Sequence, residues 1–179
     1  TILFSDIRGF TSMSEKLSPS EIVKILNKYF KSMIDVVFKY NGTLDKIVGD
    51  ELMVLYGVPL KGEGDTINAV KTAVEMFKAL DKFNEKIIKE GYEPLKIGIG
   101  INQGKAVSGN IGSEQQMNYT VIGDTINLGA RLCSHAKSGE ILISRSVKDL
   151  IGDEFNFKKI PSIEVKGKSK PIDVWLYKH

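Results

Sequence analysis

Residues 44–57, LDKIVGDELMVLYG, carry two charged side chains within a largely apolar run. Two short strand-like halves flank Gly49-Asp50, a pair of residues typical of a tight hairpin turn. Lys46 lies four residues before Asp50, and burying a charge without a partner is costly. The stretch predicts a β-hairpin, and it leaves open whether the two charged side chains are solvated or bind a ligand.

Amphipathic helices are predicted on both sides of this hairpin. Residues 18–42 place apolar side chains at three- and four-residue spacing. Ser18 is a suitable N-cap, Pro19 suits the first helical position, and Asn41-Gly42 is a suitable end. A second helix with the same apolar spacing is predicted over 65–90.

Further strands and helices are predicted along the rest of the chain. They are a strand at 1–6 ending in a turn at Gly9, a glycine-punctuated strand region at 95–112, a strand at 117–123, a helix at 124–136 with Asp124 as N-cap, a strand at 140–144, a helix at 144–152 and a β region at 163–177. The order β-α-β-β-α-β, followed by more of both, predicts an α+β sandwich. We expect a ferredoxin-like arrangement in which helices pack on a largely antiparallel sheet.

The composition is that of an ordinary globular domain. The 179 residues are 42% hydrophobic, and without a repeat or linker they predict one domain over 1–179. The net charge of +3 is too small to favour nucleic acid, which usually needs a clustered basic face. The single Cys133 excludes an internal disulfide and suits a reducing compartment. No apolar run approaches the roughly 20 residues that cross a bilayer.

Two aspartates at strand ends are the first candidates for chemistry. Asp6 follows the strand at 1–6, and Asp50 lies at the hairpin turn. Taken alone, an aspartate in a turn more often caps the backbone than binds a ligand. A pair of carboxylates at strand ends also suits Mg²⁺, which takes one or two carboxylates together with waters and substrate phosphates.

Two further features, a polar helix face and a basic loop, add weak signals. Asn127 and Arg131 are four residues apart on a predicted helix, so they share a face. Spacing alone favours a solvated polar face, although the planar fork of arginine suits phosphate oxygens. VKGKSK at 165–170 is a basic loop that contains glycine. Such loops are usually solvated, but their ammonium and backbone N–H groups can also bind phosphate.

Together these segments resemble the catalytic domain of the class III nucleotidyl cyclases, the adenylyl and guanylyl cyclase family. FSDIRGFTSMSE (4–15) is similar to the first metal-aspartate motif, and DKIVGDELM (45–53) to the motif with a lysine and the second metal aspartate. YTVIGDTINLGARL (119–132) resembles the segment for base recognition and transition-state stabilisation, and VKGK (165–168) the phosphate-lysine motif. The motifs follow the family order over essentially the whole chain.

The resemblance implies two divalent cations, Mg²⁺ or Mn²⁺, bound by Asp6 and Asp50, with the backbone carbonyl of Ile7 as a further ligand. In two-metal catalysis, one ion activates the ribose 3′-hydroxyl and the other steadies the triphosphate and the departing pyrophosphate. No side chain is an obvious general base.

The resemblance also implies roles for residues outside the metal site. Asn127 would orient the ribose, and Arg131 would stabilise charge on the α-phosphate. Lys166 would contact the terminal phosphates. Lys105 lies where some relatives carry another basic residue that contacts phosphate.

By the same resemblance, Lys46 and Thr120 occupy the positions of the base-selecting pair. A lysine can donate to N1 of adenine, and a threonine hydroxyl can accept from the N6 amine. Guanine has a donor at N1 and an acceptor at O6, so it favours a carboxylate at position 46. The pair of Lys46 and Thr120 is typical of a mainly microbial subgroup of adenylyl cyclases, so ATP is the expected substrate.

The family works as a dimer with shared sites. Because this chain carries every motif, the resemblance implies a head-to-tail homodimer with two equivalent sites. The chain opens within a predicted strand, so we expect a cytoplasmic catalytic domain cut from a longer protein with regulatory domains outside this stretch. The parent protein could still be membrane-anchored.

Three alternatives stay open. A guanylyl cyclase is disfavoured by Lys46, and an inert dimerisation or ligand-sensing module is disfavoured by the complete motif set. A diguanylate cyclase shares a ferredoxin-like core, but its Gly-Gly-acidic-acidic turn is absent, because the hairpin carries Val48-Gly49-Asp50-Glu51.

Overall fold

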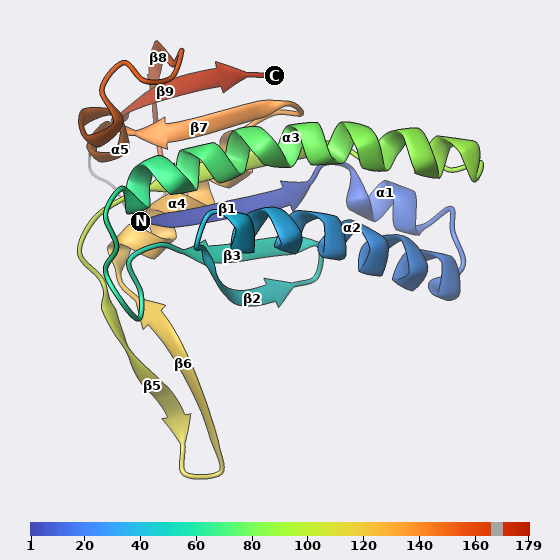
Figure 1. The fold of residues 1–179 in the computed structure, drawn as a ribbon, viewed down its shortest axis with the longest axis horizontal. Helices are drawn as coiled ribbons and strands as arrows, with labels where there is room; N and C mark the ends of the chain where they lie inside the picture. The colour runs from blue at the N-terminus through green and yellow to red at the C-terminus, as the bar shows by residue number, and fades with distance from the viewer. Residues whose placement is uncertain (166–169) are drawn as a thin grey trace.

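The computed structural model describes residues 1–165 and 170–179, and Figure 1 shows them as a helix-covered sheet with a projecting ribbon. Within these ranges the main sheet has seven strands. In spatial order they are β2 (Thr43–Val48), β3 (Glu51–Leu55), β1 (Ile2–Ile7), β4 (Ile97–Asn102), β7 (Glu140–Ser144), β9 (Ile172–Lys178) and β8 (Lys158–Ile163). Neighbouring strands are antiparallel except β4 and β7, which are parallel. The expected α+β fold with a largely antiparallel sheet is confirmed.

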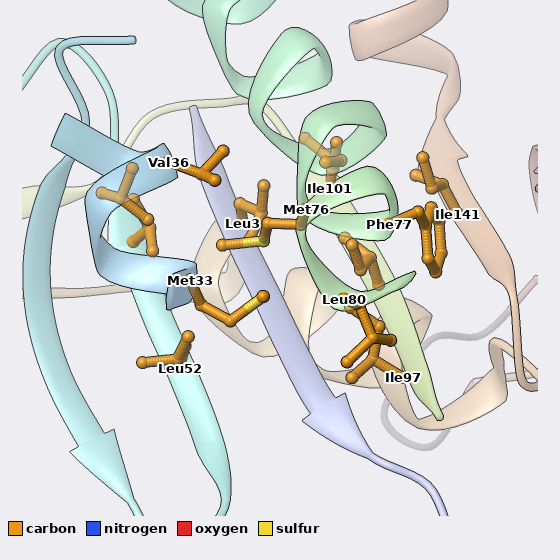
Figure 2. Close-up of a cluster of buried hydrophobic side chains, with 14 of the residues drawn as sticks. Leu3, Met33, Val36, Leu52, Met76, Phe77, Leu80, Ile97, Ile101 and Ile141 are labelled. Atoms are coloured by element: carbon orange, nitrogen blue, oxygen red, sulfur yellow. The ribbon is translucent and has the colours of Figure 1, made fainter. Parts of the chain in front are cut away.

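Two long helices cover one face of the sheet. They are α2 (Pro19–Lys39) and α3 (Asp65–Lys89), and the short α5 (Arg145–Ile151) packs beside α3. Figure 2 shows Met33 of α2 and Met76 and Phe77 of α3 pointing toward strand residues such as Leu3. This layer holds the largest cluster of buried apolar side chains and fixes the helices on the sheet.

The opposite face is covered by α4 (Asp124–His135), which packs mainly on β4 and β1. The helix comes very close to the sheet because β4 has glycine at position 100. A Cβ atom added there would lie 2.1 Å from the backbone nitrogen of Cys133. A smaller apolar cluster between α4, β6 and the sheet includes Phe4, Met53 and Val121.

A two-stranded ribbon leaves the body of the molecule (Figure 1). It consists of β5 (Val107–Ser113) and β6 (Gln116–Ile122), which pair with each other and not with the main sheet. The predicted strand region at 95–112 therefore splits, with β4 in the core sheet and β5 in the ribbon. The loop between them, residues 103–106, separates the two sheets.

Helix boundaries test the sequence predictions directly. Ser18 is the N-cap of α2, as predicted from the sequence, and its side chain accepts a hydrogen bond from the Glu21 backbone N–H. The prediction that Asp124 is the N-cap of α4 is wrong by one position, because Gly123 is the cap and Asp124 is the first helical residue. The turn at Gly9 is confirmed by its φ of 74°, but a short helix, α1 (Phe10–Ser14), follows it. None of the helices in the described ranges is both long and apolar enough to span a membrane.

Candidate active site

The carboxylates of Asp6 and Asp50 meet at one end of the central strands. Pairing of Ser5 with Leu52 brings the end of β1 beside the β2–β3 turn. Gly49 adopts a φ of 61° in that turn, a left-handed conformation that favours glycine. The pKa of Asp50 is affected by the nearby carboxylate of Asp6 and by the backbone N–H of Ile7. The structure therefore places the Asp6 and Asp50 carboxyl groups and the Ile7 backbone close together.

Burial and mutual repulsion change the acidity of this corner. Desolvation, with the negative charge of Asp6, raises the pKa of Asp50 to about 6. Desolvation and the same two aspartates raise the pKa of the adjacent Glu51 to about 7. Such crowding of acidic groups is what a bound cation would relieve, so the residues fit a divalent metal ion.

The candidate metal site has few protein ligands. Among the described residues, no group of three or more His, Cys, Asp or Glu side chains is arranged to hold a metal. The remaining ligands of an ion on Asp6 and Asp50 would have to be backbone oxygen, water or substrate phosphate. Mg²⁺ is commonly bound in this way.

Arg8 supports the first aspartate, a contact that the sequence analysis missed. Its guanidinium donates to Oδ2 of Asp6 at 3.0 Å and to the carbonyl oxygen of Cys133 at 2.6 Å. Cys133 belongs to α4, so Arg8 ties the end of β1 to that helix. A basic residue two positions after a candidate ligand was a visible signal, but its second partner lies 125 positions away.

The predicted base-selecting pair is assembled within one protomer. Nζ of Lys46 donates to Oγ1 of Thr120 at 3.1 Å, although one residue lies on β2 and the other at the base of the ribbon. Thr120 is buried, and the Lys46 side chain is 43% exposed. Asp45, which the sequence analysis also missed, contacts both residues.

Asn127 and Arg131 lie four residues apart on α4, as predicted. Asn127 is exposed and Arg131 is half-buried. Within residues 1–165 and 170–179, neither side chain has a hydrogen-bond or ion-pair partner, and in particular neither contacts Asp6 or Asp50. Within one protomer, Asn127 and Arg131 are therefore not part of the site formed by the Asp6 and Asp50 carboxylates.

The two predicted phosphate lysines have different outcomes. Lys105 is exposed in the loop before β5 and lines a cavity of about 720 Å³ together with Thr1 and Ile2. It therefore lies at the opposite end of β1 from Asp6 in the same protomer. Lys166 is outside the residues that the structure describes.

Comparison with known proteins identifies the family. The family model described as the adenylate and guanylate cyclase catalytic domain matches residues 1–178. The chain belongs to this cyclase family. The resemblance found in the sequence is confirmed by a match over nearly its full length.

Individual relatives of this cyclase domain agree with the assignment. An adenylate cyclase of Anabaena cylindrica is 37% identical over 99% of the chain, which spans 36% of that relative's length. The solved structure of the adenylyl cyclase CyaB from P. aeruginosa has a TM-score of 0.95 and 39% identity, covering 98% of this chain and 91% of CyaB. The structure of the guanylyl cyclase Cya2 has a TM-score of 0.93 and 42% identity, covering 97% of this chain and 88% of Cya2.

These similarities do not by themselves show whether the substrate carries adenine or guanine. The relatives of this cyclase domain include enzymes named for either nucleotide, at nearly the same identity. The choice of base therefore has to be argued from the side chains that would face it.

Proposed function

We propose that this cyclase domain converts ATP to 3′,5′-cyclic AMP and pyrophosphate. The observation that carries the proposal is the contact between Lys46 and Thr120. The ammonium group is a donor only, which suits the N1 acceptor of adenine. A hydroxyl beside it can accept from the N6 amine, so the pair complements adenine and opposes the N1 donor of guanine.

The reaction needs the 3′-oxygen of the ribose to attack the α-phosphorus. The new bond closes the cyclic phosphate, the bond from the α-phosphorus to the bridging oxygen breaks, and pyrophosphate leaves. The proton of the 3′-hydroxyl passes to water or to substrate. Two divalent cations, when bound, would lower the pKa of that hydroxyl and neutralise phosphate charge.

The chain's own residues bind and orient the reactants. Asp6 and Asp50, with the carbonyl of Ile7, would hold Mg²⁺ or Mn²⁺. The amide of Asn127 would orient the ribose, and the guanidinium of Arg131 would stabilise the charge that develops at the α-phosphate. For the terminal phosphates we propose Lys166, with Lys105 as a further contact.

The proposed catalytic unit is a homodimer with two shared sites. Support comes from Asn127 and Arg131, whose side chains do not contact the carboxylates of their own protomer within the described residues and so are available to a partner's. The ribbon also carries exposed apolar side chains that a partner could cover, namely Val107, Ile111, Met117, Tyr119 and Ile122. Exposed apolar side chains gathered on one projecting element are typical of an association surface.

An assay of the products tests the proposal. The chain is incubated with ATP or GTP and Mn²⁺, and the products are separated by chromatography, with EDTA as the control. We expect cyclic AMP and pyrophosphate from ATP, dependent on the metal. Preferential formation of cyclic GMP from GTP would favour a guanylyl cyclase, and no product from a folded dimer would favour an inert module.

A further inference from the structure

Asp45 is a buried carboxylate in contact with both residues of the base-selecting pair. Its side chain is only 2% exposed. Oδ2 lies 3.0 Å from Oγ1 of Thr120 and 3.2 Å from Nζ of Lys46. With the 3.1 Å contact from Lys46 to Thr120, the three polar groups form a closed triangle.

A β-bulge makes this triangle possible. Leu44 of β2 pairs with Val54 and Lys46 pairs with Met53, so Asp45 is the extra residue between them. Neighbouring side chains in a regular strand point to opposite faces of the sheet. The bulge changes that alternation and lets Asp45 and Lys46 contact the same hydroxyl.

The hydrogen-bonding capacity of the Thr120 hydroxyl can be counted. A hydroxyl has one proton to donate and two lone pairs that accept. The ionised carboxylate of Asp45 can only accept, so the proton of Thr120 is directed to it. The ammonium of Lys46 can only donate, so it occupies one lone pair. One acceptor position of Oγ1 is left.

We propose that Asp45 is a positioning residue for purine selection, which accepts the hydrogen bond of the Thr120 hydroxyl and thereby leaves that hydroxyl only as an acceptor toward the base. This inference rests on the proposed function, since it concerns the same base site. A free threonine hydroxyl could rotate to donate to O6 of guanine as easily as it accepts from N6 of adenine. With Asp45 in place the hydroxyl has no proton for guanine, and the amine of adenine is the group it can bind.

The preference is measured by binding as well as by turnover. The 3′-deoxy forms of ATP and GTP lack the attacking hydroxyl, so their dissociation constants with Mn²⁺ report recognition alone. The readout is the ratio of the two dissociation constants, together with the ratio of kcat/KM for ATP and GTP. General damage to the protein raises both dissociation constants or lowers both kcat/KM values, so each ratio changes little.

Asp45→Asn keeps the shape but supplies an N–H that can donate to Thr120. We expect the preference for the adenine nucleotide to fall about tenfold in both ratios, the size of one hydrogen bond. Asp45→Ser, a smaller residue that can also donate, should shift the ratios in the same direction. The test therefore does not depend on whether one variant folds.

Two comparisons separate this role from a structural one. In a Thr120→Val background the hydroxyl is absent, so Asp45→Asn should change the ratios much less. In a Thr120→Ser background the hydroxyl is retained, and the full effect should return. Asp35→Asn is the matched charge control, since Asp35 forms an exposed ion pair with Lys31 at 3.5 Å on α2, and it should leave both ratios unchanged.

The outcomes distinguish the two proposals. A wild-type chain that binds 3′-deoxy-ATP preferentially but forms no cyclic AMP contradicts the proposed function, while the binding ratios still decide the role of Asp45. The Asp45 proposal is overturned by wild-type binding that favours guanine or neither base. It is also overturned if Asp45→Asn and Asp45→Ser leave the ratios unchanged, or if the full effect persists without the Thr120 hydroxyl.

Discussion

Nζ of Lys46 lies 3.1 Å from Oγ1 of Thr120, although the two residues are 74 positions apart in the chain. The contact joins the edge strand β2 of the main sheet to the base of the β5–β6 ribbon. A donor and a buried hydroxyl are thereby placed side by side at a position where a purine edge could meet both. The proposed preference for ATP depends on this arrangement.

Reversing the polarity of this pair should change the preferred nucleotide. Lys46→Glu with Thr120→Cys replaces a donor by an acceptor, so N1 of adenine loses its partner and N1–H of guanine gains one. Because unpaired buried polar groups are penalised, we expect the ATP:GTP ratio of kcat/KM to fall at least about tenfold. An unchanged ratio in a folded double variant would show that Lys46 does not contact the base.

Loss of either aspartate that we propose as a metal ligand should nearly abolish turnover. We expect Asp6→Ala or Asp50→Ala to reduce kcat by at least the ~10²–10³-fold typical of one preorganised electrostatic element. Circular dichroism and dimer mass would establish that each variant is folded and assembled. Near-normal activity in either variant would refute the two-metal assignment.

Mixed dimers should recover activity if each site draws on two chains. Under the proposal one subunit supplies Asp6 and Asp50, and the other supplies Lys46, Thr120 and Arg131 with the remaining substrate contacts. Equal amounts of Asp6→Ala and Arg131→Ala protomers that exchange freely give about half mixed dimers, each with one intact site. Activity should therefore return to about one quarter of wild type.

The control for this mixture is Asp6→Ala with Asp50→Ala. Both changes fall on the same side of a site, so no mixed dimer has an intact one. Recovery in the control, or none in the first mixture after exchange has been demonstrated, would contradict the shared-site arrangement.

The stability of the metal-free protein should depend on pH through the carboxyl groups of Asp50 and Glu51. Desolvation and neighbouring carboxylates raise the pKa of Asp50 to about 6 and that of Glu51 to about 7. Acids with raised pKa values take up protons on folding, so their contribution to the free energy of unfolding falls as pH rises from about 4 to about 7. In EDTA, Glu51→Gln should therefore raise Tm more at pH about 8 than at pH about 5.

Glu15→Gln is the matched control for that experiment, because Glu15 is exposed on the surface. It should change Tm little at either pH. Mn²⁺ should raise the Tm of the wild type more at the higher pH, since protons compete with the metal for the carboxylates. If Tm changed with pH in the same way for Glu51→Gln as for the wild type, the raised pKa of Glu51 would be contradicted.

The close approach of α4 to the sheet should not tolerate a larger residue at Gly100. A Cβ there would lie 2.1 Å from backbone nitrogen of Cys133, so the helix must shift. We expect Gly100→Ala to cost about 1–3 kcal/mol in the free energy of unfolding. Activity should also fall, because α4 carries Asn127 and Arg131.

Gly109→Ala is the matched control, because a Cβ at that position meets nothing within 4 Å. Its effect should stay within about 0.5 kcal/mol. Denaturant unfolding of both variants measures the difference. Equal stability of the two would show that contact with α4 does not limit the residue at position 100.

Local features of the chain were predictable from the sequence because their signals lie within a few residues. The hairpin follows from Gly49-Asp50 between apolar runs, and the start of α2 follows from Ser18 and Pro19, which are confirmed as N-cap and first helical residue. Motif order was also sufficient to identify the family, since each motif is a short continuous stretch. The roles of the individual site residues remain predictions.

Only the tertiary structure decided the contacts that depend on strand register or that join segments far apart in the chain. Periodicity over 95–112 could not show that β4 and β5 belong to different sheets, because each partner strand lies elsewhere in the chain. Arg8 reaches Cys133 only because α4 packs closely on β4. Asp45 meets Lys46 and Thr120 because a bulge shifts the register of β2, and residue spacing alone predicts opposite directions for adjacent side chains.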